Sequence, residues 1–269
     1  MRKGIVLSSI FEKGGTGKST ITYNLAYCLS QNYKVLIIDL DGQSADITYY
    51  MLGEENLKNR KDIPTIVSVF ENTSTLDNVI LTVRNKLDLI PANTDVTNLS
   101  SEYKITTFQN MIRRLKREYD FIFIDVSPSP NQGHLLCLSV TDYLIPITVL
   151  DGACTAALLS LNQSVFEVQS YCHSNVQFLG IVINKYDQRL NISKTMLKQL
   201  DLLANEMGTI IFNTKIHQNV GLSEQMLFSQ SIFEYLSFNK SAAKAAKEYS
   251  ALTEEILERI NQFEKGDVH

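Results

Sequence analysis

Short apolar runs, each bounded by polar or turn residues, recur along the chain and predict the strands of a sheet. The runs cover 4–10, 34–40, 86–91, 120–126, 142–150, 177–184 and 208–212. Between them lie longer stretches in which apolar residues recur every three or four positions, as in an amphipathic helix. These predicted helices cover 19–29, 105–118, 156–171, 193–207 and 241–260.

The alternation of strands and helices indicates the fold class. The runs over 35–39 and 121–125 are almost continuously apolar, which is typical of parallel strands covered on both faces. We therefore expect an α/β fold with a doubly wound, mostly parallel sheet and helices on both faces. In such a sheet, ligands bind at the carboxyl ends of the strands.

The remaining stretches indicate how the chain is organised. Two polar segments without a clear period, 53–60 and 72–85, are expected to be surface connections around a short helix near 64–70. No proline- or glycine-rich linker, repeat or low-complexity segment separates one part of the sequence from another. We therefore expect one domain over residues 1–269.

The composition excludes several classes of protein. Although 44% of the 269 residues are hydrophobic, no apolar run reaches about 18 residues, so a membrane-spanning helix is not expected. The amino-terminal segment lacks the features of a secretory signal, and we expect a cytoplasmic protein. The net charge of −4 argues against a surface covered in positive charge. The four cysteines form no C-x-x-C pair, which favours reduced, packed thiols.

The most specific motif is Glu-Lys-Gly-Gly-Thr-Gly-Lys-Ser-Thr over residues 12–20, between the first predicted strand and the first helix. Its glycines let backbone N–H groups surround phosphate oxygens, and the helix amino terminus adds its positive dipole end. Lys18 is expected to reach the β and γ phosphates, and the Ser19 hydroxyl to bind Mg²⁺. A glycine-rich turn without a ligand is the weaker interpretation of a loop that ends in Gly-Lys-Ser. The predicted nucleotide-binding residues are Lys13, Gly14, Gly15, Thr16, Gly17, Lys18, Ser19 and Thr20.

Acidic residues follow two of the predicted strands. Because side chains alternate along a strand, Asp39 and Asp41 are expected to point to the same side, towards the ligand crevice. Asp125 ends an apolar strand, where a carboxylate can bind Mg²⁺, usually through water. Either Asp39 or Asp41 alone could instead cap the following helix, and that alternative stays open.

The phosphate loop also carries a family resemblance. The common motif has glycine where this chain has Glu12, and a second lysine, Lys13, follows directly. The resulting K-G-G-x-G-K-[ST] sequence resembles the deviant phosphate loop of the ParA/MinD family of ATPases. The resemblance implies that Lys13 reaches across an ATP-sandwiched homodimer to the phosphates on the other subunit. A cation supplied in this way would stabilise charge that develops during phosphoryl transfer.

The segments around the acidic residues extend the resemblance. The sequence from Asp39 to Gln43 resembles the D-x-D-P-Q segment of ParA proteins, with Gly42 in place of proline. By this resemblance Asp41 holds the attacking water or a water bound to Mg²⁺, and Asp39 supports it. The residues after Asp125 correspond loosely to the family's D-x-P-P-S loop, which senses the γ phosphate.

Two later segments resemble the part of the family site that faces the base. Asn184 ends a strand in an N-K-x-D-like sequence and offers donors and acceptors, which suits an adenine edge, although a turn residue is the alternative. Asn219 lies in a stretch similar to the ParA sequence I-P-R-N-V-x-L-S-E, which covers adenine in the family. His217 and Gln218 replace Pro-Arg there, and Gly221 replaces a residue that is often basic.

The resemblance as a whole indicates a ParA-type partition ATPase that uses ATP and Mg²⁺, in the short form without an amino-terminal helix-turn-helix. Family members form a homodimer on ATP, bind double-stranded DNA nonspecifically and are stimulated by a centromere-binding ParB-type partner, which implies a nucleoid-associated protein. For DNA the sequence offers Lys215, Lys240, Lys244 and Lys247, the last three at helical spacing. A solubilising stripe is the alternative interpretation of these lysines.

The nearest rival is a MinD-like membrane-associated positioning ATPase. Its amphipathic carboxyl-terminal helix has no counterpart here, because the tail over 259–269 carries only Ile260, Phe263 and Val268 as apolar anchors. We therefore expect no membrane partner. An iron–sulfur reductase would need bridging cysteines in a glycine-flanked setting, and a bacterial tyrosine kinase would need a terminal tyrosine cluster; the sequence has neither. A nucleotide-binding scaffold without turnover stays an alternative, although the set of Lys18, Ser19, Asp41 and Asp125 favours turnover.

Overall fold

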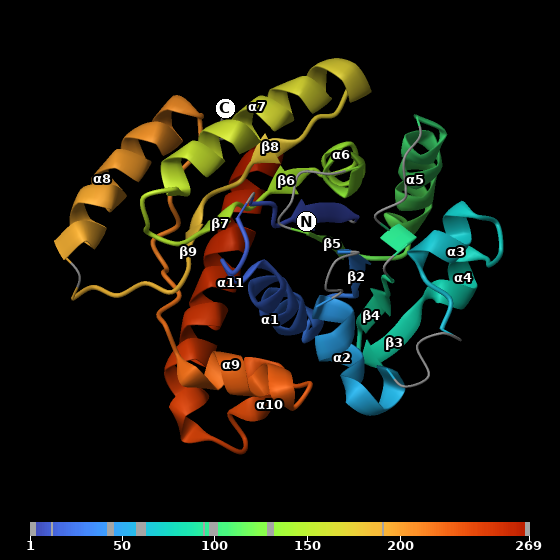
Figure 1. Cartoon of the computed structure of the whole chain (residues 1–269), viewed down its shortest axis with the longest axis horizontal. Coiled ribbons are helices and arrows are strands. Elements are labelled where there is room, and N and C mark those ends of the chain that lie inside the picture. Colours follow the sequence, from blue (N-terminus) through green and yellow to red (C-terminus); the bar gives the residue numbers. More distant parts are fainter. Residues whose placement is uncertain are drawn as a thin grey trace.

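The structure is a computed structural model and describes residues 4–11, 13–41, 46–57, 63–93, 95–96, 102–127, 132–189 and 191–266. A seven-stranded sheet in the order β3-β4-β2-β5-β1-β6-β8 runs through its centre (Figure 1). The strands are β1 (Ile5–Ser8), β2 (Val35–Leu40), β3 (Leu81–Arg84), β4 (Leu87–Ile90), β5 (Phe121–Val126), β6 (Tyr143–Leu144) and β8 (Gln177–Phe178). All pair in parallel except β3, which is antiparallel to β4. A second, parallel pair joins β7 (Ile147–Thr148) to β9 (Val182–Ile183).

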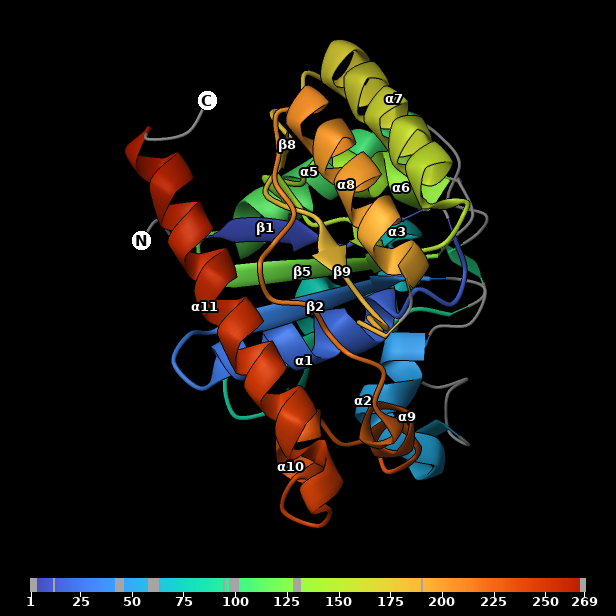
Figure 2. The same ribbon diagram turned by 90° about the vertical axis from the view of Figure 1, so that its left-hand side faces the viewer.

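Helices cover both faces of the main sheet. One face packs against α1 (Lys18–Ser30), α2 (Asp46–Leu57) and α11 (Ala243–Lys265). The other packs against α3 (Ile66–Phe70), α4 (Leu76–Val79), α5 (Glu102–Leu115), α6 (Gln132–Leu138) and α7 (Cys154–Cys172). Figure 2 shows α1 on one side of the strands and α5, α6 and α7 on the other. The remaining helices are α8 (Asn191–Glu206), α9 (Val220–Leu227), α10 (Ile232–Tyr235) and the 3-10 turn η3 (Lys240–Ala242).

The alternation of side chains along the strands explains the two layers. In β1, Ile5 and Leu7 belong to the core on one face and Val6 to the core on the other. Val35 and Leu36 divide in the same way in β2, and all five side chains are completely buried. Central parallel strands covered on both faces have this pattern. The predicted doubly wound α/β fold is confirmed. None of the described helices is long and apolar enough to cross a membrane.

Two predicted strands are each interrupted. The run over 142–150 divides at Pro146 into β6 and β7, and the run over 177–184 divides around Gly180 into β8 and β9. Proline has no N–H to donate to a ladder, although the Pro146 carbonyl accepts from Val182 N at 2.9 Å. A side chain at Gly180 would begin 2.6 Å from the ring of Phe212, so glycine lets that ring pack against the backbone.

Three other boundaries differ from the predictions. The strand over 208–212 is wrong, because only a single bridge between Ile181 and Ile211 forms there and the apolar side chains pack against neighbouring elements instead. The segment 72–85 is not only a connection: it forms α4 and β3, an edge strand whose partial exposure hides the apolar pattern. Helix α2 continues past the expected loop start to Leu57, with a kink at Gly53, where φ is 76°.

The other helix predictions agree with the structure. The short helix near 64–70 is confirmed as α3. The five longer predicted helices are confirmed as α1, α5, α7, α8 and α11, the last preceded by η3. The long helices and the short helix α3 were therefore identified from the sequence, whereas α4 and the edge strand β3 were not.

Candidate functional site

The phosphate loop leads from β1 into the first residue of α1. Gly15 and Gly17 have positive φ angles of 72° and 88°, which favour glycine. A side chain at Gly17 would also begin 2.3 Å from the amide nitrogen of Asn184. The Gly17 carbonyl accepts from Ile21 N at 2.9 Å, so the helix starts directly at the end of the loop. Its amino terminus is thus available to an anion. Glu12, Gly42, Gln43 and the segment 128–130 lie outside the described residues.

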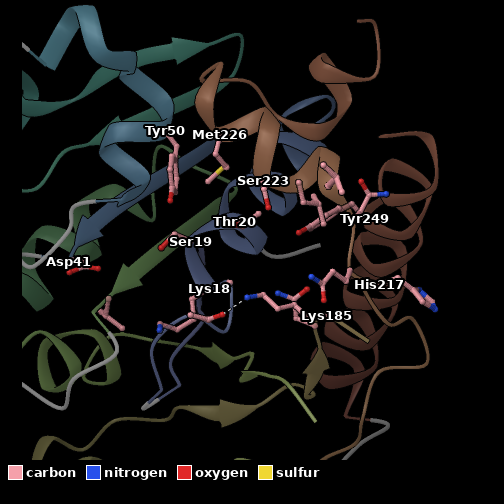
Figure 3. Close-up of a pocket in the computed structure, with 18 residues that line it drawn as sticks. Lys18, Ser19, Thr20, Asp41, Tyr50, Lys185, His217, Ser223, Met226 and Tyr249 are labelled. Atoms are coloured by element: carbon pink, nitrogen blue, oxygen red, sulfur yellow. Dashed lines mark hydrogen bonds between the residues drawn. The ribbon is translucent and has the colours of Figure 1, made fainter. Parts of the chain in front are cut away.

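A cavity of about 690 Å³ lies in front of this helix amino terminus. The loop and the start of α1 line one part of it, and Asp41 and Tyr50 line another. The segment from His217 to Met226, together with Tyr249, lines the rest. Figure 3 shows Asp41 and Tyr249 on opposite sides of the start of α1. The phosphate-binding motif and the segment expected to face the base therefore border the same cavity.

Ser19, which lines the cavity, is hydrogen-bonded to the buried Asp125. The Ser19 hydroxyl donates a 2.6 Å hydrogen bond to Oδ2 of Asp125. Asp125 is completely buried, and its Oδ1 has no hydrogen-bond partner among the described residues. Burial raises the pKa of Asp125, and the nearby Asp39 carboxyl raises it further. Since buried polar atoms ordinarily have partners, an unpaired oxygen beside a serine hydroxyl fits a site for a hydrated cation.

The side chains that could supply ligands also indicate which cation would fit this site. Within the described ranges, no three His, Cys, Asp or Glu side chains gather closely enough to hold a metal ion by themselves. In nucleotide sites Mg²⁺ keeps several waters and takes further ligands from the phosphates, so it needs few protein groups. Oxygen donors from Ser19 and Asp125, with Asp41 on the cavity wall, fit Mg²⁺ bound together with a nucleotide.

Asp39 and Asp41 have different surroundings. Asp41 is 3% exposed and lines the cavity, whereas Asp39 is completely buried and does not line it. The Asp39 carboxylate accepts from Asp41 N at 2.8 Å, from Thr48 N at 3.1 Å and from Thr48 Oγ1 at 2.5 Å. Burial raises the pKa of Asp39 to about 7, although these donors lower it. The cap alternative therefore applies to Asp39, which bonds an amide in the first turn of α2.

The two lysines of the phosphate loop point in different directions. Lys18 is 6% exposed, lines the cavity and donates to the Lys13 carbonyl at 3.4 Å. The Lys13 ammonium instead forms an ion pair with Asp151, and the two side chains are 35% and 37% exposed. They border a second cavity of about 340 Å³, which Lys185 also lines. Lys13 therefore does not reach the nucleotide cavity of its own chain.

Two residues that follow β9 hold the phosphate loop. Asn184 Nδ2 donates to the Thr16 carbonyl at 2.7 Å. Lys185 Nζ donates to the Gly15 carbonyl at 2.8 Å (dashed line in Figure 3). Asn184 lines the cavity, but its amide nitrogen, which we expected to face adenine, binds the loop instead. The sequence analysis did not identify Lys185 as a site residue. Its position directly after Asn184 in the N-K-x-D-like sequence could have indicated it.

The segment expected to cover the base is anchored to the last helix. Asn219 caps α9: its Oδ1 accepts from Gly221 N at 2.8 Å, and its Nδ2 donates to the Ser241 carbonyl at 3.2 Å. His217 Nδ1 lies 2.7 Å from a carboxylate oxygen of Glu248. Both Asn219 and His217 line the same cavity as the phosphate loop.

Three large side chains that line the cavity were missed at the sequence level. Tyr50, Met226 and Tyr249 come from α2, α9 and α11. In the sequence they have the spacing of core residues, and no local motif distinguishes them from neighbouring apolar positions. Only the packing of three separate helices around α1 brings them to one site.

The four lysines suggested for DNA come from the loop before α9, the turn η3 and helix α11. Lys244 and Lys247 are exposed in α11, whereas Lys240 is exposed in the preceding turn η3. Lys244 Nζ lies 3.7 Å from Glu248, and Lys215 donates to the Asn213 carbonyl at 3.0 Å. Lys240 and Lys247 are thus the two whose exposed ammonium groups suit phosphate contacts best.

Comparison with known proteins shows similarity along most of the chain. The model of a family described as an AAA domain matches residues 4–178. The chromosome partitioning protein ParA of Myxococcus xanthus is 24% identical, with 92% of this chain and 86% of that protein covered. A putative plasmid partition protein from Borrelia burgdorferi, solved with AMPPNP, is 25% identical with a TM-score of 0.72, covering 97% of this chain and 99% of that one.

A further solved structure confirms the fold class. The cell division ATPase MinD from Pyrococcus furiosus has a TM-score of 0.73 at 20% identity, covering 95% of this chain and 99% of that chain. The family match spans well over half of the chain and includes the phosphate loop, Asp41 and Asp125. The chain therefore belongs to this AAA domain family, in the ParA/MinD group of P-loop ATPases.

Proposed function

We propose that this chain, as one ATPase domain, hydrolyses ATP in a Mg²⁺-dependent reaction and uses the cycle to partition DNA. The observation that carries the proposal is that Lys18, Ser19 and Asp41 line one cavity, with Asp125 hydrogen-bonded to Ser19 behind its wall. A phosphate loop alone would support binding. A nearly buried carboxylate on the wall of the same cavity adds a group that can orient a water molecule.

The residues divide the work of phosphoryl transfer. The backbone N–H groups of the loop and the Lys18 ammonium hold the phosphates and offset their negative charge. Asp41 orients a water for in-line attack on the γ phosphorus. A bond forms between the water oxygen and that phosphorus while the bond to the oxygen of ADP breaks, which yields ADP and phosphate. Because the site is largely shielded from water, these fixed charges act more strongly than they would in solution.

Ser19 and Asp125, with Asp41 through water, would hold Mg²⁺. When bound there, the ion would offset the negative charge of the phosphates during transfer. The unpaired Oδ1 of Asp125 supports this assignment, since the oxygen is buried without another donor among the described residues. A cation beside it would also favour the charged form of a carboxyl whose pKa is raised by burial.

Two copies join on ATP, and Lys13 of each reaches the phosphates bound to the other. The position of Lys13 supports this arrangement, because its side chain points away from the cavity of its own chain and pairs with Asp151. An ion pair at partly exposed positions is worth about 1 kcal/mol or less, so a phosphate contact can replace it.

The ATP-bound dimer binds double-stranded DNA nonspecifically and associates with the nucleoid. Exposed Lys240 and Lys247 support the binding, and a dimer would double the number of such contacts. The net charge of −4 implies that a single chain binds DNA weakly. A ParB-type partner stimulates hydrolysis and thereby releases the dimer.

The test is retention of the purified chain on nonspecific duplex DNA with ATP, ADP or no nucleotide, over a range of salt concentrations. Retention only with ATP and Mg²⁺, lost as salt rises, supports the proposal. Phosphate release measured in parallel must depend on Mg²⁺. Binding to anionic liposomes with no ATP-dependent retention on DNA would replace partition by the MinD-like membrane function, and absence of phosphate release would contradict the enzyme assignment.

A further inference from the structure

One buried carboxylate holds two separate parts of the backbone beside the cavity. Oδ1 of Asp39 accepts from Asp41 N at 2.8 Å. Oδ2 of Asp39 accepts from Thr48 N at 3.1 Å and from Thr48 Oγ1 at 2.5 Å. Asp41 follows the end of β2, and Thr48 lies in the first turn of α2. The carboxylate therefore sets the separation between the end of the strand and the start of the helix.

The Thr48 hydroxyl extends this network to a third strand. While it donates to Asp39, its oxygen accepts from Ala92 N at 3.1 Å, just beyond the end of β4. Asp39, Thr48 and Ala92 are 0%, 1% and 1% exposed. Water therefore cannot easily replace the hydroxyl if it is removed. Ala92 N would lose its partner, and Asp39 Oδ2 would keep only the longer bond from Thr48 N.

This hydrogen-bond network includes the backbone N–H of Asp41. Its carboxylate lines the nucleotide cavity, and its own N–H is bonded to the carboxylate that Thr48 holds. A water-orienting group loses much of its effect when it moves by about 1 Å, so the backbone at Asp41 must be held firmly. Thr48 does not line the cavity and can act only through Asp39 and the backbone.

We propose that Thr48 is a positioning residue for hydrolysis, which keeps the Asp41 carboxylate in its reactive place through the Asp39 carboxylate. The inference rests on the proposed ATPase function and assigns to it a residue outside the cavity. It predicts that loss of the hydroxyl slows turnover while nucleotide affinity is retained, because Thr48 has no bond to the part of the phosphate loop that the structure describes, residues 13–20.

The test compares Thr48→Val, Thr48→Ser and a matched control, Thr209→Val. Thr209 is 3% exposed and its hydroxyl donates to the Phe178 carbonyl, far from Asp41 along the chain. We expect Thr48→Val to lower kcat at least about tenfold with less than about twofold change in the Kd of a fluorescent ATP analogue. Thr48→Ser should recover most of the turnover, and Thr209→Val should leave it near that of the wild type.

Hydrogen exchange at the Asp41 amide gives a readout that does not depend on turnover. It should be faster in Thr48→Val than in the wild type and near normal in Thr48→Ser. An unchanged kcat in Thr48→Val, equal loss in Thr48→Ser, or unchanged exchange at Asp41 would overturn the inference. A wild-type chain that releases no phosphate would instead contradict the proposed function, and the exchange measurement would still decide whether Thr48 holds Asp41.

Discussion

Asp39 and Asp125 lie directly opposite each other on the neighbouring parallel strands β2 and β5. Both are completely buried, and burial raises the pKa of each carboxyl. Side chains at paired positions of neighbouring strands point to the same face, so two acidic groups share one water-poor end of the sheet. Positive charge from Lys18 and from a nucleotide-bound cation would stabilise their ionised forms, which links the acidic site to ligand binding.

Lys18→Ala should remove nucleotide binding. The ammonium lies in the cavity at the amino terminus of α1 and is 6% exposed, so it would contact phosphate with little competition from water. Loss of such a charge should weaken the Kd for ATP at least about thirtyfold, as measured by isothermal titration calorimetry. Equal ATP affinity in the variant and the wild type would show that the nucleotide does not bind at this loop.

Asp41→Ala should bind ATP and form the dimer but hydrolyse slowly. The carboxylate lines the cavity without being part of the phosphate loop, so its loss removes orientation of water rather than contacts to the nucleotide. Single-turnover phosphate release should fall about a hundredfold or more. Asp187→Ala is the control, because this carboxylate pairs with Arg189 at 2.6 Å and does not line the nucleotide cavity. A wild-type rate of phosphate release in Asp41→Ala would contradict the role proposed for Asp41.

Lys13→Ala should bind ATP yet fail to form the ATP-dependent dimer. Its ammonium points away from its own cavity and is paired with Asp151, so its loss should leave the affinity of the single chain nearly unchanged. Light scattering with ATP reports the mass directly. Asp151→Asn keeps Lys13 and removes only its partner, and this variant should dimerise at least as readily as the wild type. Full dimer mass in Lys13→Ala would contradict the assignment.

Lys240→Glu/Lys247→Glu should reduce ATP-dependent retention on DNA. Both side chains are exposed around the start of α11, and phosphate contacts through them would release counterions. The slope of log K against log salt should become shallower by about 1 for each phosphate contact that is lost. Lys194→Glu/Lys198→Glu, at two exposed lysines in α8, changes the net charge by the same amount and serves as the control. An equal effect of both variants would indicate only general charge.

Cys137 should resist alkylation in the folded chain. It is completely buried, and burial raises the pKa of its thiol to about 12, so little thiolate exists at pH 8. Mass spectrometry after brief treatment with iodoacetamide should find Cys172 labelled before Cys137, since Cys172 is partly exposed. Labelling of Cys137 as fast as that of Cys172 would contradict its burial.

The same thiol implies a pH dependence of stability. The unfolded chain releases the Cys137 proton near the ordinary pKa of 9.0, whereas the folded chain retains it up to about 12. The unfolded state therefore binds fewer protons in this range, and the free energy of unfolding should fall as pH rises, by up to about 1.4 kcal/mol per unit. Urea titrations of the wild type and Cys137→Ala at pH 8 and pH 10 should show a smaller fall in the variant.

The sequence was most informative where chemistry and geometry lie within a few consecutive residues. The phosphate loop combines glycines, lysine and serine at the start of a helix, and its residues Gly15 and Gly17 to Thr20 line one end of the nucleotide cavity. Lys13 and Gly14 line the second cavity instead. Asp41 and Asp125 were predictable because the carboxyl ends of parallel strands meet at one edge of a sheet. The hydrogen bonds that Asp39 and Asp125 accept from Thr48 and Ser19 were not predictable, because they join separate parts of the chain.

The contacts that the sequence did not reveal join distant parts of the chain. Lys13 pairs with Asp151, which is 138 residues later, and nothing local distinguishes that aspartate from other loop residues. Tyr249 lines the cavity from the last helix, although its spacing marks it only as a core residue. The edge strand β3 was overlooked because exposure on one side removes the apolar run that identifies central strands.

The hydrogen bonds from Asn184 and Lys185 to the phosphate loop have a consequence for synthesis of the chain. Asn184 donates to the Thr16 carbonyl, 168 residues earlier in the chain. The family match at residues 4–178 ends before Asn184 and Lys185. A nascent chain that has exposed β1, α1 and β5 to solvent still lacks the groups that hold the loop in shape. Because contacts of such long range form late in folding, nucleotide capture should begin only after β9 has left the ribosome. Chains whose sheet is complete would then bind ATP, whereas shorter nascent chains would bind little of it.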